Sequence, residues 1–393
     1  MNHGELLAWH YATRKPVRLQ WADGKIVAAT KTTEPPPRDR WVAPALVDLQ
    51  VNGYAGVDFQ QDGLTVDDLL RAVRALHRDG CGRFLLTLIS DEWPLMLKRL
   101  AHLRTLRAVS DELRHAIAGW HLEGPFLSSE PGFSGAHRAE VMCDPMPEQI
   151  EDLRMATGED LVMITLSPER LDAIAAIGQA VALGIKVSVG HTNAPAKRLT
   201  QAIRAGAFGF THLGNGCPRE LDRHDNILWR MFETPKLMVS LIPDGVHVAP
   251  ALFRLTHREI GADRIYYVSD AMAAGGAPPG RYRLAHLELE VGEDSIVRLP
   301  GTGNLAGSSL RPIDGALKAA SMLEVAWQTV WPRYSDVPAG LMGLPRGLEA
   351  GASADFCVLE VTPENWLEDV KVFVCGVGVP NPGASLVNGG NAV

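Results

Sequence analysis

Trp120-His121-Leu122-Glu123-Gly124-Pro125-Phe126 is the stretch of this sequence that decides the fold. The apolar residues at 116–120 predict a buried strand, and the Gly-Pro pair after Glu123 ends it. A carboxylate at the end of a buried strand is costly unless it is paired with a charge or bound to a metal. The stretch therefore predicts a functional carboxylate, Glu123, at the carboxyl end of a core strand.

Three later stretches repeat this pattern of an apolar strand that ends in polar residues. The apolar runs at 187–190, 208–211 and 265–268 lead into His191, His212 and Asp270, respectively. In a parallel barrel, active sites are built at the carboxyl ends of the strands. We therefore expect Glu123, His191, His212 and Asp270 to meet at one face of the fold.

Strand and helix patterns alternate through the middle of the chain. Strand-like runs, the first of them at 41–51, end near residues 51, 90, 123, 166, 190, 212, 242 and 270, with helical patterns such as 92–113 and 168–183 between them. This alternation is typical of βα units and a parallel sheet. Eight such strands predict an α/β fold, a closed (β/α)8 TIM-like barrel.

Short strand patterns also occupy both ends of the chain. Residues 16–21 and 25–29 flank a turn at Asp23-Gly24, and the segments at 354–359 and 372–375 predict strands near the other end. We expect the tail strands to pair with residues 1–41. The sequence thus predicts a small discontinuous domain, 1–41 plus 345–393, beside a catalytic barrel at 42–344.

Composition narrows the class of protein and its partners. The chain has 393 residues, 46% of them hydrophobic, and a net charge of −8, so no overall positive field recruits nucleic acid or an anionic membrane. Five scattered cysteines without CxxC spacing indicate reduced thiols in a cytoplasmic protein. No signal peptide is evident, and no apolar run approaches the roughly 20 residues that span a bilayer.

Glu123, His191 and His212 form a set of one carboxylate and two imidazoles. Such a set is typical of a site for Zn²⁺, or for another divalent transition metal, that keeps an open position for water. Bound Zn²⁺ lowers the pKa of that water to about 7. Any one of these residues is explained as well by a hydrogen bond to a loop, but the three together on one barrel face indicate a metal site.

Asp270 follows the last predicted barrel strand, in Val268-Ser269-Asp270-Ala271-Met272. A carboxylate beside a metal-bound water can accept its proton and later return it to a leaving group. Aspartate is equally common as the N-cap of a helix. Position alone leaves both roles open.

Several polar and glycine-containing loops are expected on the same face. The segments at 215–216, 244–247 and 305–308 offer backbone N–H groups to a polar ligand, although each is also an ordinary turn sequence. Arg223 can bind a phosphate through two parallel hydrogen bonds, or pair with Asp222 or Asp225 on the surface. A phosphorylated ligand is therefore one hypothesis.

A series of short motifs runs along most of the chain. They are Ala43-Pro44-Ala45-Leu46-Val47-Asp48-Leu49-Gln50-Val51-Asn52-Gly53, His121-Leu122-Glu123-Gly124-Pro125-Phe126, Gly135-Ala136-His137, Gly190-His191-Thr192-Asn193-Ala194, Thr211-His212-Leu213, Asp244-Gly245-Val246-His247, Ser269-Asp270-Ala271-Met272-Ala273, Leu305-Ala306-Gly307-Ser308 and the segment 347–356. Each is weak alone. In this order and spacing, the set resembles the N-acetylglucosamine-6-phosphate deacetylases of the amidohydrolase superfamily.

The resemblance implies a metal-dependent hydrolase barrel with a small β-sandwich from both termini, in a homodimer. It also implies an enzyme of amino-sugar metabolism that removes acetate from N-acetylglucosamine-6-phosphate and leaves glucosamine-6-phosphate. By motif match, Glu123, His191 and His212 hold the metal and Asp270 is the catalytic acid/base. The residues expected to bind substrate are Ala136, His137, Asn215, Gly216, Arg223, His247, Leu305, Ala306 and Gly307.

Two positions predict the number of metal ions. Many amidohydrolases carry His-x-His after the first barrel strand for a second metal, whereas this chain has Gln50 and Asn52, as a subset of the family does. Neutral amides are poor Zn²⁺ ligands compared with imidazole. We therefore expect one divalent metal per chain, Zn²⁺ before Fe²⁺, Co²⁺ or Mn²⁺.

The sequence departs from the family pattern near the expected phosphate contacts. Gly214-Asn215-Gly216 replaces a usual Tyr-Asn-Ala, and the segment 223–230 replaces a run of small residues. Three alternatives therefore stay open. They are N-acetylgalactosamine-6-phosphate as the preferred substrate, a related amidohydrolase acting on a non-phosphorylated amide, and a non-catalytic sugar-phosphate-binding protein.

Overall fold

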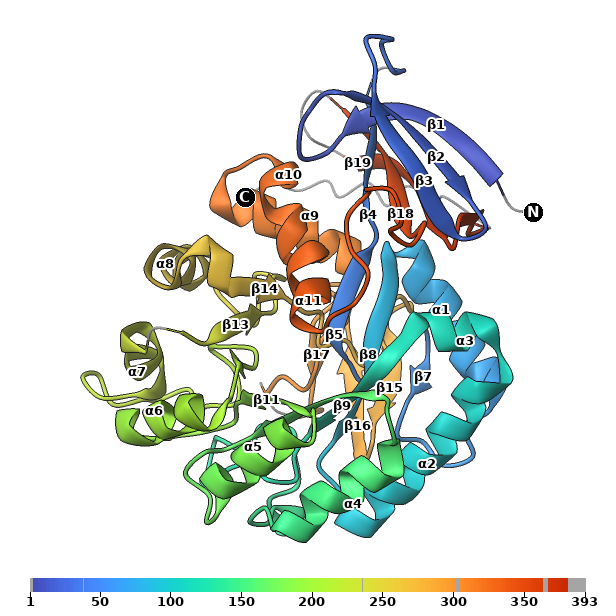
Figure 1. Cartoon of the computed structure of the whole chain (residues 1–393). Coiled ribbons are helices and arrows are strands. Elements are labelled where there is room, and N and C mark those ends of the chain that lie inside the picture. Colours follow the sequence, from blue (N-terminus) through green and yellow to red (C-terminus); the bar gives the residue numbers. More distant parts are fainter. Residues whose placement is uncertain (1–2, 38, 235, 302–303, 363–366, 381–393) are drawn as a thin grey trace.

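The computed structural model describes residues 3–37, 39–234, 236–301, 304–362 and 367–380. Its centre is an eight-stranded parallel sheet in the order β14-β13-β12-β11-β10-β9-β8-β5. These strands are β5 Leu46–Val51, β8 Cys81–Ile89, β9 Ile117–Glu123, β10 Leu161–Leu166, β11 Lys186–Val189, β12 Gly209–Phe210, β13 Met238–Leu241 and β14 Ile265–Tyr267. Val51, at the end of β5, forms a parallel bridge with Ala271 in the segment that follows β14, so the sheet nearly closes (Figure 1). The predicted (β/α)8 barrel is confirmed.

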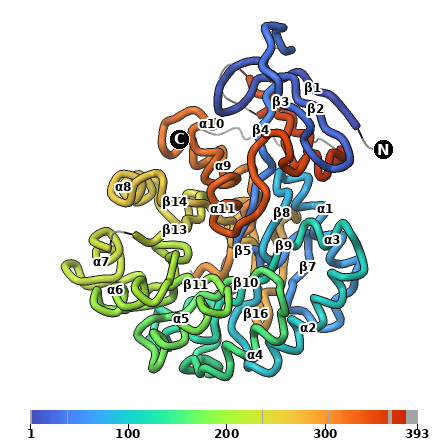
Figure 2. The backbone as a smooth tube through the Cα atoms, in the orientation of Figure 1, coloured from blue at the N-terminus to red at the C-terminus, as the bar shows by residue number. Residues whose placement is uncertain are grey.

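Helices follow most barrel strands and cover the outside of the barrel (Figure 2). α1 illustrates why they form, because Thr65 and Asp68 cap its start reciprocally and its buried stripe faces the strands. The helices are α1 Val66–Arg78, α2 Trp93–Val109, α3 Asp111–Ala116, α4 Pro147–Thr157, α5 Ala173–Ala182, α6 Ala196–Ala205, α7 Ile227–Glu233, α8 Pro250–Ile260, α9 Pro312–Leu323, α10 Trp327–Val330 and α11 Asp336–Leu341. Short 3₁₀ turns lie at η1 Ala139–Val141, η2 Ala262–Arg264 and η3 Trp331–Arg333.

Two predicted single elements prove to be pairs. The apolar run at 41–51 forms β4 (Arg40–Pro44), which pairs with β1 and β18, and then β5, which enters the barrel. The helix predicted at 92–113 is α2 followed by α3, because the Ser110 hydroxyl accepts a hydrogen bond from the Leu113 N–H and starts a new helix. Hydrophobic periodicity does not reveal where a chain changes sheet or direction.

Both ends of the chain build a second sheet of seven strands, in the order β20-β19-β18-β4-β1-β2-β3. Its other strands are β1 His3–His10, β2 Pro16–Ala22, β3 Lys25–Lys31, β18 Phe356–Val361, β19 Leu367–Val374 and β20 Val377–Gly378. Trp21 packs against Phe356 and Phe373 at ring-centroid distances of 5.0 and 5.4 Å, so the sheet folds over itself. Figure 1 shows its blue and red strands side by side above the barrel.

The expected pairing of the tail with residues 1–41 is confirmed in part. Lys25 forms an antiparallel bridge with Ser353, but β18 pairs with β4, of which only Arg40 and Trp41 lie in the predicted segment. The boundaries predicted for the two domains, 1–41 plus 345–393 and 42–344, stay a prediction. Of the small domain, residues 1–2, 38, 363–366 and 381–393 lie outside the described part of the chain.

A layer of buried polar side chains fills the barrel interior below the carboxyl ends of the strands. Nε2 of His121 lies 2.8 Å from the Thr165 hydroxyl, which lies 2.9 Å from the Thr211 hydroxyl. The Ser188 hydroxyl is 2.7 Å from that of Thr211. Because strand side chains alternate, His121 and Glu123 share the inward face of β9, and His121 lies one inward position before Glu123.

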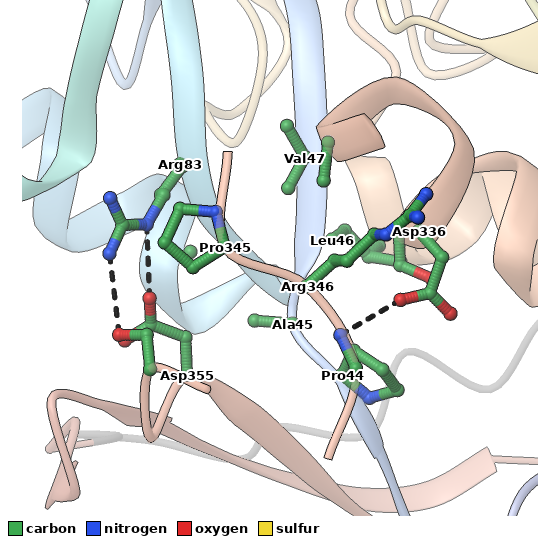
Figure 3. A pocket seen from close by; sticks show the side chains of 14 residues that line it. Pro44, Ala45, Leu46, Val47, Arg83, Asp336, Pro345, Arg346 and Asp355 are labelled. Atoms are coloured by element: carbon green, nitrogen blue, oxygen red, sulfur yellow. Dashed lines mark hydrogen bonds and ion pairs between the residues drawn. The ribbon is translucent and has the colours of Figure 1, made fainter. Parts of the chain in front are cut away.

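The terminal sheet is tied to the barrel by a junction cluster, defined here as Arg83, His115, Asp355 and Cys375. Nε of Arg83 in β8 donates to Oδ2 of Asp355 at 3.1 Å, beside a cavity of about 20 Å³ (Figure 3). Nε2 of His115 lies 2.8 Å from the same oxygen. The Cys375 backbone N–H donates to Oδ1 of Asp355 at 2.8 Å. These contacts join three segments that are distant in the sequence.

Two smaller sheets complete the structure. β6 (Gly53–Tyr54) pairs with β7 (Val57–Asp58), and β15 (Gly280–Leu284), β16 (Leu287–Val291) and β17 (Val297–Arg298) form an antiparallel sheet. Among the described helices, none combines the length and the apolarity that crossing a membrane requires.

Candidate active site

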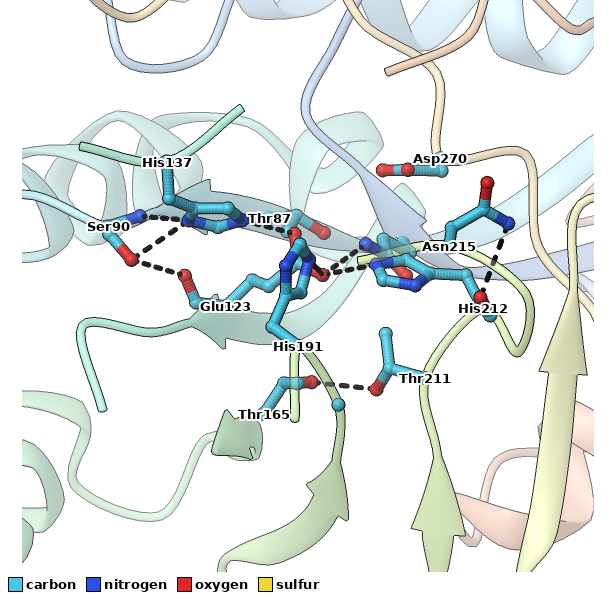
Figure 4. Close-up of polar contacts among 12 residues, drawn as sticks. Thr87, Ser90, Glu123, His137, Thr165, His191, Thr211, His212, Asn215 and Asp270 are labelled. Atoms are coloured by element: carbon cyan, nitrogen blue, oxygen red, sulfur yellow. Dashed lines mark hydrogen bonds and ion pairs between the residues drawn. The ribbon is translucent and has the colours of Figure 1, made fainter. Parts of the chain in front are cut away.

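Glu123 is the centre of the polar cluster at the carboxyl ends of the strands (Figure 4). Its Oε1 lies 2.7 Å from Nε2 of His212 and 3.5 Å from Nε2 of His191, and its Oε2 lies 3.5 Å from Nε2 of His137. Burial raises the pKa of Glu123, but the charge of His212 and the hydrogen bonds that His137 and His212 donate outweigh it and hold the pKa well below its usual range. Glu123 is therefore an ionised carboxylate inside the protein.

A hydrogen bond to the backbone fixes the tautomer of His191. Its Nδ1 lies 2.8 Å from the Phe133 carbonyl oxygen, which can only accept, so Nδ1 carries the proton and Nε2 is left with its lone pair. Gly135 and Gly216 make room for the ring, since a Cβ on either would lie within 3.0 Å of it. Second hydrogen bonds of this kind orient imidazoles that ligate metals.

The donor set fits a divalent metal. Glu123, His191 and His212 each offer one ligand atom within 4.8 Å of the others, and all three residues are buried. Nδ1 of His212 is buried without a hydrogen-bond partner among the described residues, which is costly for a polar atom. One carboxylate and two imidazoles are the ligand types that Zn²⁺ and related transition metals take. The group of three predicted from the sequence is brought together.

Three of the strand-end residues have backbone conformations that L-amino acids rarely adopt. The φ angles of His191, His212 and Asp270 are 49°, 34° and 50°. Such left-handed conformations cost of the order of 1 kcal/mol or more and cluster at functional sites. Each of these residues turns the chain at the end of its strand, where its side chain lines the cavity described below.

His137 is held as a neutral hydrogen-bond donor. The Ser90 backbone N–H donates to Nδ1 of His137 at 3.2 Å, so the ring proton is on Nε2. Burial lowers the pKa of His137 to about 4, which keeps the ring uncharged at neutral pH. An uncharged N–H that points toward Glu123 can donate to a ligand oxygen bound beside it.

Asp270 lies just after β14, the last barrel strand, and lines the same cavity as Glu123. Its Oδ1 accepts a hydrogen bond from Nδ2 of Asn52 at 2.7 Å. Burial, and then the negative charge of Glu123, raise the pKa of Asp270 to about 6, against the opposing effects of His212, His247 and Asn52. A carboxylate with a pKa in this range can both accept and return a proton near neutral pH.

A cavity of about 90 Å³ joins these groups. Its lining consists of Asn52, Ile89, Glu123, Gly135, Ala136, His137, His191, His212, Asn215, Gly216, His247, Asp270, Leu284, Leu305, Ala306 and Gly307. All but one of the thirteen predicted site residues are therefore neighbours around one cavity. The exception is Arg223, which is exposed and does not line it.

The structure also identifies functional contacts that the sequence analysis did not. The Ser90 N–H and the Phe133 carbonyl decide which nitrogens of His137 and His191 carry protons. Ser90 follows directly on β8, so the strand-end rule applied to that strand would have found it. Phe133 acts through its backbone, and its side-chain chemistry therefore carries no signal.

The junction cluster is the other place where metal-ligand types meet, with donor atoms of His115, Asp355 and Cys375 within 4.8 Å of one another. Here both Asp355 oxygens already accept hydrogen bonds, and Arg83 adds a positive charge. Nη2 of Arg83 also lies 3.3 Å from Nδ1 of His115. These contacts fit an ion-paired link between the sheets better than a metal site.

A parallel (β/α)8 barrel with a Glu-His-His set at its strand ends defines a metal-dependent hydrolase barrel of the amidohydrolase type. No protein-family model matches the chain. It is 32% identical over 346 residues to N-acetylglucosamine-6-phosphate deacetylase of Rattus norvegicus, which covers 82% of this chain and 80% of that protein. The chain is also 32% identical over 321 residues to N-acetylgalactosamine-6-phosphate deacetylase of Escherichia coli O157:H7. This match covers 79% of this chain and 80% of that protein.

A solved structure agrees with the sequence relatives. N-acetyl-D-glucosamine-6-phosphate deacetylase of Mycobacterium smegmatis, as a mutant in complex with N-acetyl-D-glucosamine-6-phosphate, superimposes with a TM-score of 0.85 at 31% identity, over 97% of this chain and 100% of that one. The chain belongs to the N-acetylglucosamine-6-phosphate deacetylase family.

Proposed function

We propose that this protein is a carbon–nitrogen hydrolase that removes acetate from N-acetylglucosamine-6-phosphate and leaves glucosamine-6-phosphate. The observation that carries the proposal is the convergence of a metal-ligand set, a neutral His137 donor and Asp270 on one cavity, in a chain of this family. Amide hydrolysis needs these parts: a source of hydroxide, a donor for the carbonyl oxygen, and an acid for the departing nitrogen.

Glu123, His191 and His212 would hold the metal. A divalent cation there supplies Lewis-acid chemistry, which makes hydroxide available from water near neutral pH. We propose one ion per chain, Zn²⁺ before Fe²⁺, Co²⁺ or Mn²⁺. Gln50 supports this number, because Nε2 of its neutral amide donates to Oε1 of Glu123 at 3.0 Å and offers no lone pair in that direction.

The protein's own groups then handle the charge and the protons. Asp270 accepts the proton of the attacking water and later donates it to the 2-amino nitrogen as the carbon–nitrogen bond breaks. Nε2–H of His137 donates to the amide oxygen as negative charge develops on it. Both side chains line the cavity, and the hydrogen bonds of Ser90 and Asn52 orient them before substrate arrives.

The remaining lining would recognise the sugar phosphate. His247 is held by Asp244, with Nδ1 at 2.6 Å from Oδ2, which leaves Nε2 for a ligand. We assign the other sugar contacts to Ala136, Asn215, Gly216, Leu305, Ala306 and Gly307, and a phosphate contact to Arg223. None of the described lining residues is Lys or Arg, so Arg223→Ala is the sharpest test of that last assignment.

N-acetylgalactosamine-6-phosphate is the second candidate substrate. It is favoured by the equal 32% identity to deacetylases named for either sugar. The two substrates differ at one hydroxyl, so ratios of kcat/KM measured side by side decide between them.

The test is acetate release from N-acetylglucosamine-6-phosphate, N-acetylgalactosamine-6-phosphate and unphosphorylated N-acetylglucosamine, with metal-loaded and chelated protein. We expect metal-dependent turnover of a phosphorylated sugar. Equal turnover of phosphorylated and unphosphorylated sugar would reject the phosphate contact but support the deacetylase activity. Tight binding of the sugar phosphate without any turnover would instead indicate a non-catalytic binding protein.

We also propose that the protein is a cytoplasmic homodimer. The reduced cysteines support the compartment, since none of the five is in a disulfide. The family resemblance supports the dimer. Sedimentation equilibrium at micromolar concentration measures the oligomeric state directly.

A further inference from the structure

Two carboxamide side chains lie at the end of β5, where both face into the barrel. Gln50 donates to Glu123, and Asn52 donates through Nδ2 to Oδ1 of Asp270 at 2.7 Å. Asn52 is only 3% exposed and lines the cavity. The contact with Asp270 is thus made inside the site, where a hydrogen bond is little weakened by water.

That contact decides which way the Asn52 amide points. With the amino group toward the Asp270 oxygen, Oδ1 must point the other way. Oδ1 is buried and has no hydrogen-bond partner in the described part of the chain. A buried carbonyl oxygen without a donor is destabilising, and the large majority of such atoms in native proteins find a partner. A donor from a bound ligand would satisfy it.

The substrate of the proposed reaction has a donor that suits this position. Its acetamido group is a planar trans amide, in which the N–H and the carbonyl oxygen point in opposite directions. When the oxygen faces Nε2–H of His137 beside β9, the N–H faces the other wall of the cavity. Asn52 and Asp270 line the cavity next to each other, just after β5 and β14, because Val51 and Ala271 pair there.

We propose that Asn52 is a further positioning residue of the site: Nδ2 orients Asp270, and Oδ1 accepts the N–H of the acetamido group. This inference rests on the proposed deacetylase function. One side chain thereby places the nitrogen that must be protonated next to the acid that protonates it. Positioning of this kind governs rate strongly, because misplacement of a reacting group by about 1 Å can cost about 10²-fold in rate.

The test compares wild type with Asn52→Leu, which keeps the size of the side chain and removes both hydrogen bonds. The matched control is Gln328→Leu. Gln328 in α10 is also a buried amide whose oxygen has no partner among the residues that the structure describes, but it does not line the cavity. We expect Asn52→Leu to lower kcat on N-acetylglucosamine-6-phosphate by about 10²-fold with unchanged metal content. The control should keep the wild-type kcat.

A second measurement isolates the role of Oδ1 without any turnover. Calorimetry on the chelated protein compares N-acetylglucosamine-6-phosphate with the analogue in which oxygen replaces the amide nitrogen. In Asn52→Leu, loss of one hydrogen bond should weaken binding of N-acetylglucosamine-6-phosphate, the amide, by about fivefold. Binding of the oxygen analogue, an ester without the N–H, should be unchanged. Asn52→Ala provides the same comparison if Asn52→Leu does not fold.

The outcomes separate this inference from the function beneath it. Equal weakening for amide and ester, or no weakening for either, overturns the contact from Oδ1 to the N–H. Wild-type kcat in Asn52→Leu overturns the positioning of Asp270 while the deacetylase function stands. Absence of wild-type turnover together with N–H-dependent binding would reject the function and retain the contact.

Discussion

The Glu123 cluster of the cavity and the junction cluster contain the same kinds of side chain but differ in what their polar atoms do. Around Glu123, Nδ1 of His212 and Oδ1 of Asn52 have no partner among the described residues, and three strand ends are held at positive φ. At the junction, both oxygens of Asp355 are hydrogen bonded to protein groups. Unsatisfied polar atoms and backbone strain are destabilising, and they persist where a ligand uses them.

The comparison separates function from stability. Changes in the Glu123 cluster should affect metal binding and rate with little loss of fold, whereas changes in the junction cluster should affect the fold and leave the rate alone.

Loss of a metal ligand should have the largest effect. Glu123→Gln removes the only charged ligand of the set, so we expect metal content by inductively coupled plasma mass spectrometry to fall from one equivalent per chain toward zero. Activity should fall by at least about 10³-fold, since metal stabilisation is worth several kcal/mol. Asp355→Asn should retain the full equivalent. A second equivalent that disappears in Asp355→Asn would make the junction a metal site after all.

Asp270→Asn should have the second largest effect on activity. The amide keeps the shape of the side chain but cannot carry the proton, so we expect kcat to fall by about 10³-fold with metal content and Tm close to wild type. Steady-state acetate release measures the rate. Near wild-type turnover would remove Asp270 from the mechanism, and Asp355→Asn is the control whose kcat should not change.

His137→Gln should have a somewhat smaller effect on rate. The change removes an imidazole N–H aimed at the ligand oxygen, and loss of one such donor costs about 10²-fold to 10³-fold in kcat. KM should change far less than kcat if the donor acts on charge that develops during the reaction. The control is His115→Gln, an imidazole of the junction. An effect on KM alone would make His137 a binding residue only.

The junction cluster should make a pH-dependent contribution to the free energy of unfolding. Burial lowers the pKa of His115, but the contacts of its ring with Asp355 and Cys375 outweigh burial and raise the pKa to about 9. The same contact with His115 helps to lower the pKa of Asp355 to about 2. The contribution of His115 to the stability of the fold is therefore complete below the pKa of the unfolded state, about 6.5. It is lost as the pH rises through the folded-state pKa of about 9. The Asp355 contribution is lost only as pH falls from about 4 through about 2.

Denaturant unfolding between pH 6.5 and 9.5 tests this expectation. We expect wild type to lose about 2–3 kcal/mol more stability over this range than His115→Gln, because one pKa unit corresponds to about 1.4 kcal/mol. Parallel loss in both proteins would show that His115 does not carry the effect. The rate constant kcat, measured at pH 6.5, should be the same in both.

Much of this protein was determined by its sequence alone. The alternation of apolar and polar stretches specifies buried strands, and a carboxylate or imidazole after several of them specifies one functional face, because parallel strands end on the same side of a barrel. Glu123, His191, His212 and Asp270 could be found this way since each is marked by a local conflict between burial and charge. The family motifs in their order then narrowed the chemistry.

Only the tertiary structure decided the rest. The break between β4 and β5 depends on which sheet each half joins, and the proton positions of His137 and His191 depend on backbone groups of Ser90 and Phe133. Oδ1 of Asn52, which has no hydrogen-bond partner in the described ranges, points away from Asp270 because Asp270, 218 residues away, holds the amino group. Hydrogen bonds between distant segments leave no local pattern in a sequence, so their partners and directions appear only when the chain is folded.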